Sequence, residues 1–129
     1  MAISLEDVLK AVAEKTRLRL LNLLRMRRVC VCDLQSILAL PQSVVSRHLS
    51  ILRHVGLVDD TRAGSRVIYS RADAITPAAD AIWSLIEKAA AEDKVLQSDL
   101  RALDAAVQRG ECAGIRGSSL EEQITSCAS

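Results

Sequence analysis

Two cysteines one residue apart, Cys30 and Cys32, are the residues of this chain whose types and spacing best suit chemistry. Thiolates are soft ligands that select soft metal and metalloid ions. We expect both cysteines at the start of a short helix over residues 31–38, because Leu34, Ile37 and Leu38 repeat at helical spacing. The positive end of that helix and the arginines of residues 25–28 would favour the thiolate form. The pattern therefore predicts a site for a soft ion.

The spacing also predicts how binding would act on the fold. Side chains at positions i and i+2 of an intact helix point about 200° apart. We therefore expect Cys30 and Cys32 to bind one ion only if the first helical turn is distorted. The alternative is that both thiols are buried and pack as small hydrophobic groups. The residue between them leaves one of the two facing outward, which disfavours that alternative.

Length and composition restrict the class of protein. The chain has 129 residues, half of them hydrophobic, but Trp83 and Tyr69 are its only aromatic residues. A core of Leu, Val, Ile and Ala favours helices packed on helices. No apolar run approaches the roughly 18–20 residues of a membrane span, and residues 1–10 lack the pattern of a signal peptide. We expect a cytoplasmic protein with reduced cysteines, folded as one domain over residues 1–109 with a flexible Gly/Ser-rich tail over 110–129.

Charge is segregated along the chain although the net charge is only +1. Residues 15–71 contain eleven Lys or Arg and three Asp, whereas residues 72–129 contain five basic and ten acidic residues. A basic middle segment between acidic ends indicates contact with a polyanion, and merely solvated faces are the alternative.

Hydrophobic periodicity predicts the elements that would position these residues. We expect a first helix over residues 5–13 and a second from the N-cap Thr16 to the basic patch at 25–28. Two further helices are expected over 31–38 and 42–54, and Leu40–Pro41 separates them. A hairpin follows, with strands at 57–58 and 67–69 and Gly64 at its turn. One long helical stretch is expected over residues 75–107, with Pro77 in its first turn.

Two short helices with a tight connection, followed by a hairpin, predict a winged helix-turn-helix. The helix over residues 42–54 would enter a major groove with the polar residues of its first turns, while Val45, Leu49 and Leu52 face the core. The candidate DNA-contacting residues of this helix are Gln42, Ser43, Ser46, Arg47 and His48. Arg62 and Arg66 flank the hairpin tip and would reach phosphates or a minor groove. For His48 and His54, a phosphate contact or simple packing is the interpretation to prefer over metal ligation.

Residues 44–58 closely resemble the recognition helix of the arsenic-repressor (ArsR/SmtB) family, through Val45-Ser46 and His48-Leu49 to Gly56-Leu57-Val58. The resemblance extends back to residues 15–21, forward to the wing at 66–69, and covers about residues 5–95. It implies a homodimer that pairs through its first and last helices, binds a palindromic operator on double-stranded DNA and represses transcription. The run Cys30-Val31-Cys32-Asp33-Leu34 resembles the metal box of that family, and binding there would release the operator.

The inducing ion is only partly determined by the residues. With imidazole and carboxylate partners taken as absent, Zn(II) becomes a weaker candidate than As(III) or Sb(III), with Cd(II) or Pb(II) as the alternative. Relatives that respond to arsenic often carry a third cysteine where this chain has Gln35. Cys112 is the first candidate to replace it and Cys127 the second, unless both are tail thiols without a role. The metal site that other relatives build from Asp and His on the last helix is not expected, because no histidine lies there.

Other functions remain as alternatives. A thiol redox or persulfide sensor on the same fold would use Cys30 or Cys32 with another cysteine, although cysteines one residue apart rarely close a disulfide. An enzyme is not expected, since the sequence has no paired carboxylates, nucleophile–histidine arrangement or phosphate-binding glycine loop. A pure protein-interaction module would leave the arginines of the hairpin unexplained.

Overall fold

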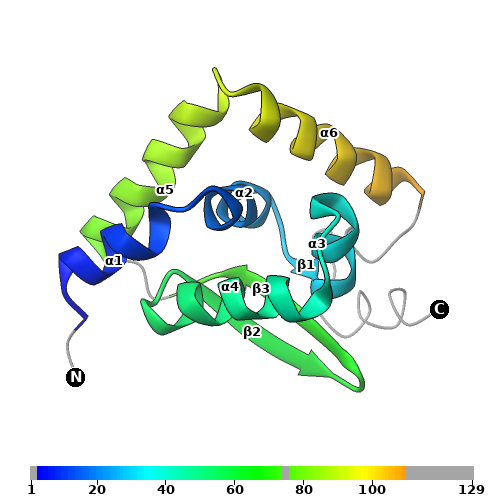
Figure 1. The fold of residues 1–129 in the computed structure, drawn as a ribbon, viewed down its shortest axis with the longest axis horizontal. Coiled ribbons are helices and arrows are strands. Elements are labelled where there is room, and N and C mark those ends of the chain that lie inside the picture. Colours follow the sequence, from blue (N-terminus) through cyan, green and yellow to red (C-terminus); the bar gives the residue numbers. More distant parts are fainter. Residues whose placement is uncertain (1–2, 74–75, 110–129) are drawn as a thin grey trace.

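The computed structural model describes residues 3–73 and 76–109. A small three-stranded antiparallel sheet lies at one edge of a group of helices (Figure 1), so the expected fold class, a mainly helical winged helix-turn-helix, is confirmed. The elements in chain order are α1 (Leu5–Val12), α2 (Lys15–Leu24), β1 (Val29–Cys30), α3 (Val31–Leu38), α4 (Gln42–His54), β2 (Val58–Ala63), β3 (Arg66–Arg71), α5 (Pro77–Ala90) and α6 (Lys94–Gln108). No helix in the described ranges is both long and apolar enough to cross a bilayer.

The predicted bounds of α2 need a correction at both ends. Its N-cap is Glu14, whose carboxylate accepts a hydrogen bond from the backbone N–H of Arg17 at 2.8 Å, so the prediction of Thr16 as the cap was wrong. The helix ends at Leu24, before the basic patch of residues 25–28 that was expected to form its last turn. A carboxylate satisfies an exposed N–H at a helix start as a hydroxyl does.

The single helix expected over residues 75–107 is wrong, because α5 and α6 are separate helices. The chain turns at residues 91–93, and Asp93 caps α6 by accepting a hydrogen bond from the backbone N–H of Leu96 at 3.0 Å. Aspartate favours this position because its side chain competes for backbone donors. The break lets α6 fold back over α2, as the two upper helices in Figure 1 show.

The hairpin formed by β2 and β3 is the predicted wing, and a third strand joins it. Gly64 and Ser65 connect the strands, and Gly64 adopts a φ of 60°, a left-handed conformation that glycine accommodates without strain. The strand that the sequence did not reveal is β1, which pairs with β3 through Val29↔Tyr69 and Cys30↔Ile68. Two residues are too few to show a period of two, so periodicity could not have found it.

The core consists largely of leucines from α2, α3 and α4. The side chains of Leu20, Leu21, Leu23, Leu34 and Leu49 are completely buried. Val45, Leu49 and Leu52 of α4 face this core, as predicted. The opposite face of α4 is therefore the one left for solvent or a partner.

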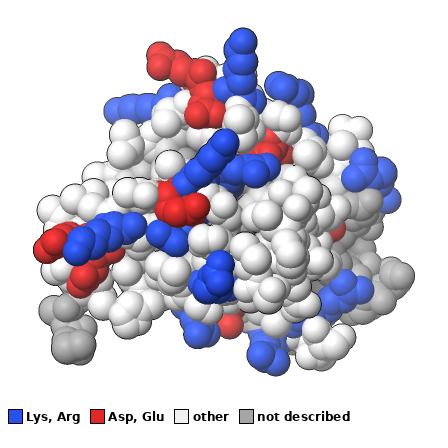
Figure 2. Space-filling model, viewed as in Figure 1, with Lys and Arg blue, Asp and Glu red and all other residues white. Residues whose placement is uncertain are grey.

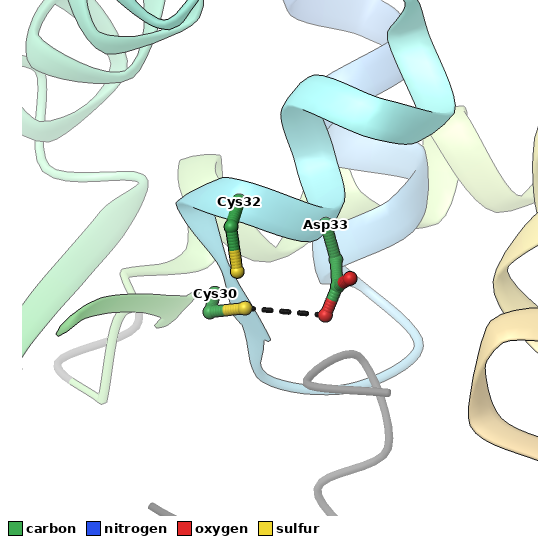
Figure 3. Close-up of side chains that lie close together, drawn as sticks. All are labelled: Cys30, Cys32 and Asp33. Atoms are coloured by element: carbon green, nitrogen blue, oxygen red, sulfur yellow. Dashed lines mark hydrogen bonds between the residues drawn. The ribbon is translucent and has the colours of Figure 1, made fainter. Parts of the chain in front are cut away.

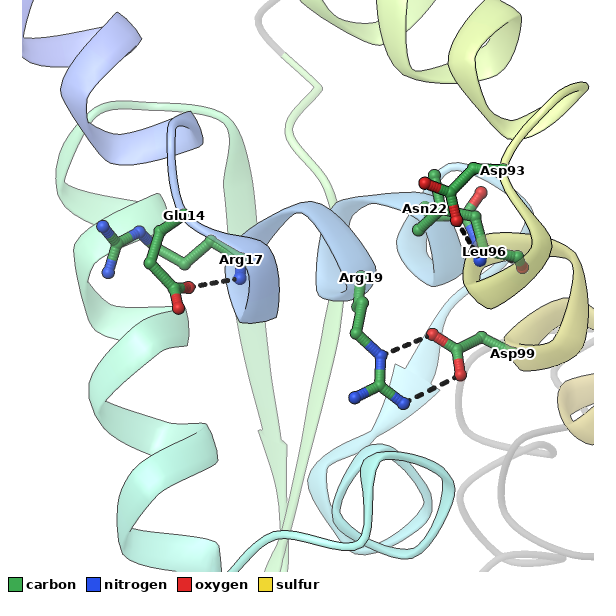
Figure 4. A network of polar contacts seen from close by, with 7 residues as sticks. All are labelled: Glu14, Arg17, Arg19, Asn22, Asp93, Leu96 and Asp99. Atoms are coloured by element: carbon green, nitrogen blue, oxygen red, sulfur yellow. Dashed lines mark hydrogen bonds and ion pairs between the residues drawn. The ribbon is translucent and has the colours of Figure 1, made fainter.

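Two polar links fasten α6 to α2 (Figure 4). Arg19 of α2 donates two hydrogen bonds to Asp99 of α6, with N–O distances of 2.8 and 2.9 Å. The side-chain amide of the buried Asn22 donates to the carbonyl of Leu96 at 3.0 Å. A two-pronged guanidinium–carboxylate pair fixes geometry as well as adding energy, so these contacts set where α6 lies.

A third polar link fixes α4 against α2. The Nδ1 of His48 lies 3.0 Å from Nη1 of Arg17 and 3.8 Å from the carboxylate of Glu14, and its side chain is only 13% exposed. Burial lowers the pKa of His48, Arg17 and Arg47 lower it further, and Glu14 acts in the opposite direction. His48 thus faces the protein interior as a neutral residue that positions α4.

Replacing Asp99 by alanine should destabilise the fold, because it leaves the largely buried Arg19 without its carboxylate partner. We expect the free energy of unfolding to fall by about 2–4 kcal/mol in urea denaturation. The matched control is Asp104→Ala on the exposed face of the same helix, which should change it by less than about 0.5 kcal/mol. Equal effects of the two variants would show that the Arg19–Asp99 pair has no special role.

Acid should weaken the packing of α4 through His48. Its folded pKa lies below its unfolded value of about 6.5, so the unfolded state binds the proton more readily. Stability is therefore complete above pH about 6.5 and declines as the pH falls from there toward the folded pKa. Unfolding measured between pH 7.5 and 5 should show a smaller decline for His48→Gln than for the unchanged chain. His54 is exposed. If His54→Gln reduced the decline in stability as much as His48→Gln, the decline could not be assigned to His48.

Candidate metal site and nucleic-acid interface

Three potential ligand atoms meet at the junction of β1 and α3 (Figure 3). The two sulfurs of Cys30 and Cys32 and a carboxylate oxygen of Asp33 all lie within 4.8 Å of one another. Cys30 precedes the helix as its N-cap, with extended backbone angles of φ −77° and ψ 152°. The expectation that an ion must distort a helical turn was therefore wrong, because only Cys32 belongs to the helix.

Asp33 is the ligand candidate that the sequence reasoning missed. Its carboxylate is nearly buried, and the thiol of Cys30 donates a hydrogen bond to its Oδ2 at 3.1 Å. The argument against Zn(II) from an absent carboxylate fails for the same reason. The available signal was the spacing of three from the N-cap to the first helical turn, which brings the two side chains together.

The electrostatics of Cys30 also differ from expectation. Burial raises the pKa of its thiol, and hydrogen bonds with Cys32 and Asp33 raise it further. The helix end and the nearby arginines were expected to favour the thiolate, but desolvation of a side chain that is 1% exposed outweighs them. Cys30 therefore carries its proton at neutral pH until an ion replaces it.

Cys32 is exposed, and the arginine beside its sulfur comes from the wing. Nη1 of Arg66, at the start of β3, donates a hydrogen bond to the sulfur of Cys32 at 3.2 Å. Arg25, by contrast, is directed at Asn22 and Met26. The contact joins the candidate metal site to a residue that was proposed from sequence to contact DNA.

A hollow of about 300 Å³ brings the two candidate sites together. It lies between the first turn of α3, the start of α4 and the wing tip, and is lined by Cys30, Val31, Cys32, Gln35, Gln42, Ser65, Arg66 and Val67. A guest bound to the sulfurs would therefore share its space with Gln42 and Arg66.

The other proposed DNA-contacting residues lie on the free face of α4 and on the wing. Gln42, Ser43, Arg47 and Arg62 are exposed, and Ser46 is partly exposed. On the face drawn in Figure 2, Lys and Arg side chains are spread over the surface, and several of them lie along the lower edge, where Figure 1 has α4 and the hairpin. Cys112 and Cys127, and with them the expected tail, lie outside the described residues.

A second hollow adds basic residues that the sequence reasoning did not select. It has a volume of about 570 Å³, lies between α1 and α4, and contains Lys10 and Arg17 beside Arg47. Only the tertiary packing of α1, α2 and α4 brings these three cations together. Arg53 of α4 pairs with Asp60 of β2 at 3.2 Å, which ties the helix to the wing.

Comparison with known proteins gives matches to one group of regulators. Residues 14–60 match the family model described as bacterial regulatory protein, arsR family. The chain is 42% identical over 67 residues to a transcriptional repressor SmtB homolog of Synechocystis, covering 52% of this chain and 51% of that protein. It is 41% identical over 64 residues to the arsenical resistance operon repressor of Escherichia coli K12, covering 49% and 55%. A cadmium resistance regulator CadC homolog of Staphylococcus aureus is 30% identical over 83 residues, covering 64% of each chain. The chain thus spans about half the length of the first two of these curated relatives.

Solved structures extend the similarity to about two thirds of this chain. HlyU from Vibrio cholerae superposes with a TM-score of 0.60 at 31% identity, covering 67% of this chain and 91% of that one. The same protein described as reduced gives a TM-score of 0.58 at 32% identity, covering 65% and 85%. On the family match, the relatives and this shared fold together, the chain belongs to the arsR family of bacterial regulatory proteins.

Proposed function

We propose that this chain is a DNA-binding transcriptional repressor that releases its operator when Cys30, Cys32 and Asp33 bind a soft metal or metalloid ion. One observation carries the proposal: the hollow into which the cysteines open is also lined by Gln42 of α4 and Arg66 of the wing. The ion site and the DNA-contacting surface therefore compete for the same side chains. Membership in a family of regulatory proteins agrees with the expectation that the chain is not an enzyme.

The DNA-binding half of the proposal rests on α4 and the wing. Gln42, Ser43, Ser46 and Arg47 would meet base edges and phosphates in a major groove, while Arg62 and Arg66 would contact the backbone or a minor groove. His48 is withdrawn from this set as a direct contact and assigned to holding α4 against α2.

A homodimer is part of the proposal, because one recognition helix reads too few base pairs for useful affinity. Exposed apolar side chains on three helices support it: Leu5 and Leu9 of α1, Leu85 of α5 and Val95 of α6. An isologous pairing through these helices would place two copies of α4 on a palindromic operator.

The coupling between ion and DNA follows from two contacts. An ion on Cys32 uses a sulfur lone pair and occupies the hollow beside that sulfur, so it competes with the hydrogen bond from Arg66. Cys30 is paired with Ile68, so movement of β1 reaches β3 directly. Displacing the wing tip would lower operator affinity, and by linkage DNA would lower ion affinity by the same factor.

The ion itself is proposed from ligand chemistry. Two thiolates and one carboxylate suit Cd(II) or Pb(II), whereas As(III) and Sb(III) favour a third sulfur, for which Cys112 is the candidate. Relatives named for arsenical resistance and for cadmium resistance both match this chain. We keep As(III) or Sb(III) as the first assignment and Cd(II) or Pb(II) as the alternative, in a protein of the cytoplasm.

A redox-responsive repressor is the second candidate, favoured by the closeness of the two sulfurs. A peroxide would oxidise the two thiols to a disulfide with loss of two protons and two electrons, and would itself be reduced to water. Operator release by hydrogen peroxide in metal-free, chelator-treated protein would favour this candidate. Release by the ion in fully reduced protein would favour the first.

Truncating the start of α4 should weaken operator binding. On the DNA upstream of its own gene, Gln42→Ala should reduce the binding free energy by about 1–3 kcal/mol and relax the specificity for one base. Arg47→Ala should weaken binding to all DNA sequences and reduce the salt dependence of that binding. Fluorescence anisotropy on that duplex and on a shuffled one measures both effects. Arg101→Ala, an exposed charge on α6, is the control. If it weakened binding as much as Arg47→Ala, α4 would not be the reading element.

Removing any of the three ligands should weaken ion binding. Cys30→Ser, Cys32→Ser and Asp33→Asn should each lower Cd(II) affinity by at least about 10–100-fold, the loss that even supporting groups around a metal cause. Wild-type affinity should rise with pH, because the ion displaces the proton of Cys30. Titration followed by sulfur-to-metal absorption measures this.

The same titration separates the two ion classes. Cys112→Ser should weaken As(III) binding and leave Cd(II) binding unchanged. Should the Cys30→Ser, Cys32→Ser double variant still release DNA with either ion, the proposed site would be wrong.

A further inference from the structure

A cluster of arginines surrounds a small hollow that the proposed function does not use. The hollow, with a volume of about 190 Å³, lies between the connection from α2 to β1 and the end of β3. Its lining is Leu24, Arg25, Met26, Arg27, Arg28, Ser70, Arg71 and Asp73. Four arginines and one aspartate line it, so the local charge is positive.

Two of the arginines that line this hollow carry donors that lack acceptors. Nε and Nη1 of Arg27 and Nε of Arg71 are buried and have no hydrogen-bond partner within residues 3–73 and 76–109. Buried donors of a charged group are rarely left unpaired, because they have lost water without gaining a partner. Their presence at one hollow indicates that an acceptor of negative charge belongs there.

The guanidinium of Arg71 is held in place by its other contacts. It lies 4.9 Å from the centre of the Trp83 ring, and its Nη2 donates to Asp80 at 3.2 Å. Arg25 is similarly anchored, since its Nε donates to Asn22 at 3.1 Å. A ligand in the hollow would therefore meet arginines that lose little freedom on binding.

We propose that this hollow is a binding site for one small tetrahedral oxyanion of the phosphate class. The planar fork of arginine matches two oxygens of such an ion, and several forks can share it. Pockets for larger organic ligands usually have about 300–1,000 Å³. The smaller volume here favours a free inorganic ion over a nucleotide.

The position of the hollow separates it from the proposed DNA-contacting surface. Arg66 starts β3 near the wing tip, and Arg71 ends it. Five residue steps at about 3.3 Å each place the two ends about 17 Å apart. A duplex lying along α4 and the wing tip would not bring its phosphates to the opposite end of β3, so the ion is assigned as free rather than as part of DNA.

The test uses the full-length, reduced, metal-free protein and inorganic phosphate. Addition of the protein should broaden the ³¹P resonance of phosphate. Phosphate should also raise the Tm of the protein above its value in chloride at equal ionic strength. Arg27→Gln should weaken phosphate binding at least tenfold, and Arg27→Lys should do so substantially, because lysine keeps the charge but loses the fork. Arg101→Gln removes the same charge from an exposed position on α6 and should leave phosphate binding unchanged.

Three results would overturn the proposal. The first is the absence of any phosphate-specific effect in the unchanged chain. The second is equal weakening by Arg27→Gln and Arg101→Gln, which would reduce the effect to overall charge. The third is displacement of phosphate by the upstream duplex, which would assign the arginines to DNA. None of these depends on whether the cysteines bind an ion, so this site and the proposed function fail separately.

Discussion

The short pairing of β1 with β3 is the constraint on which the rest of the site depends. It holds Val29 opposite Tyr69 and Cys30 opposite Ile68, and so keeps Cys30 extended just before α3 begins. An extended residue followed by a helical turn directs the Cys30 and Cys32 sulfurs to one place and brings Asp33 to meet them. Because β3 is also the inner strand of the wing, the same two residue pairs connect the thiols to the hairpin.

Under the proposed function, one small volume would serve two ligands. Arg66 donates a hydrogen bond to Cys32 here, and it would contact a phosphate or a groove edge when DNA is bound. Burial raises the pKa of Cys30, so a bound ion would have to displace the proton of that thiol. The cost of desolvating a thiolate would then restrict the response to ions with a strong preference for sulfur.

Buried polar groups fix the arrangement of helices that the leucine core alone leaves open. Leucine side chains pack in many similar ways, whereas a two-pronged ion pair such as Arg19–Asp99 has one geometry. The contact of His48 with Arg17 does the same for α4. The orientation of α4 therefore depends on a few polar contacts, and a substitution at any one of them would disturb it.

The sequence by itself determined the helices α1, α3 and α4, the wing with Gly64 at its turn, the inward face of α4 and the pair of cysteines, because each depends on local periodicity or turn chemistry. It missed the break before Asp93, where a cap replaces the usual Gly or Pro, and the strand β1, whose two residues carry no period. Tertiary structure alone decided that burial raises the pKa of Cys30 and that Arg66 reaches Cys32. These depend on segments far apart in the chain being brought together and on the loss of water there, and no pattern along the sequence encodes either.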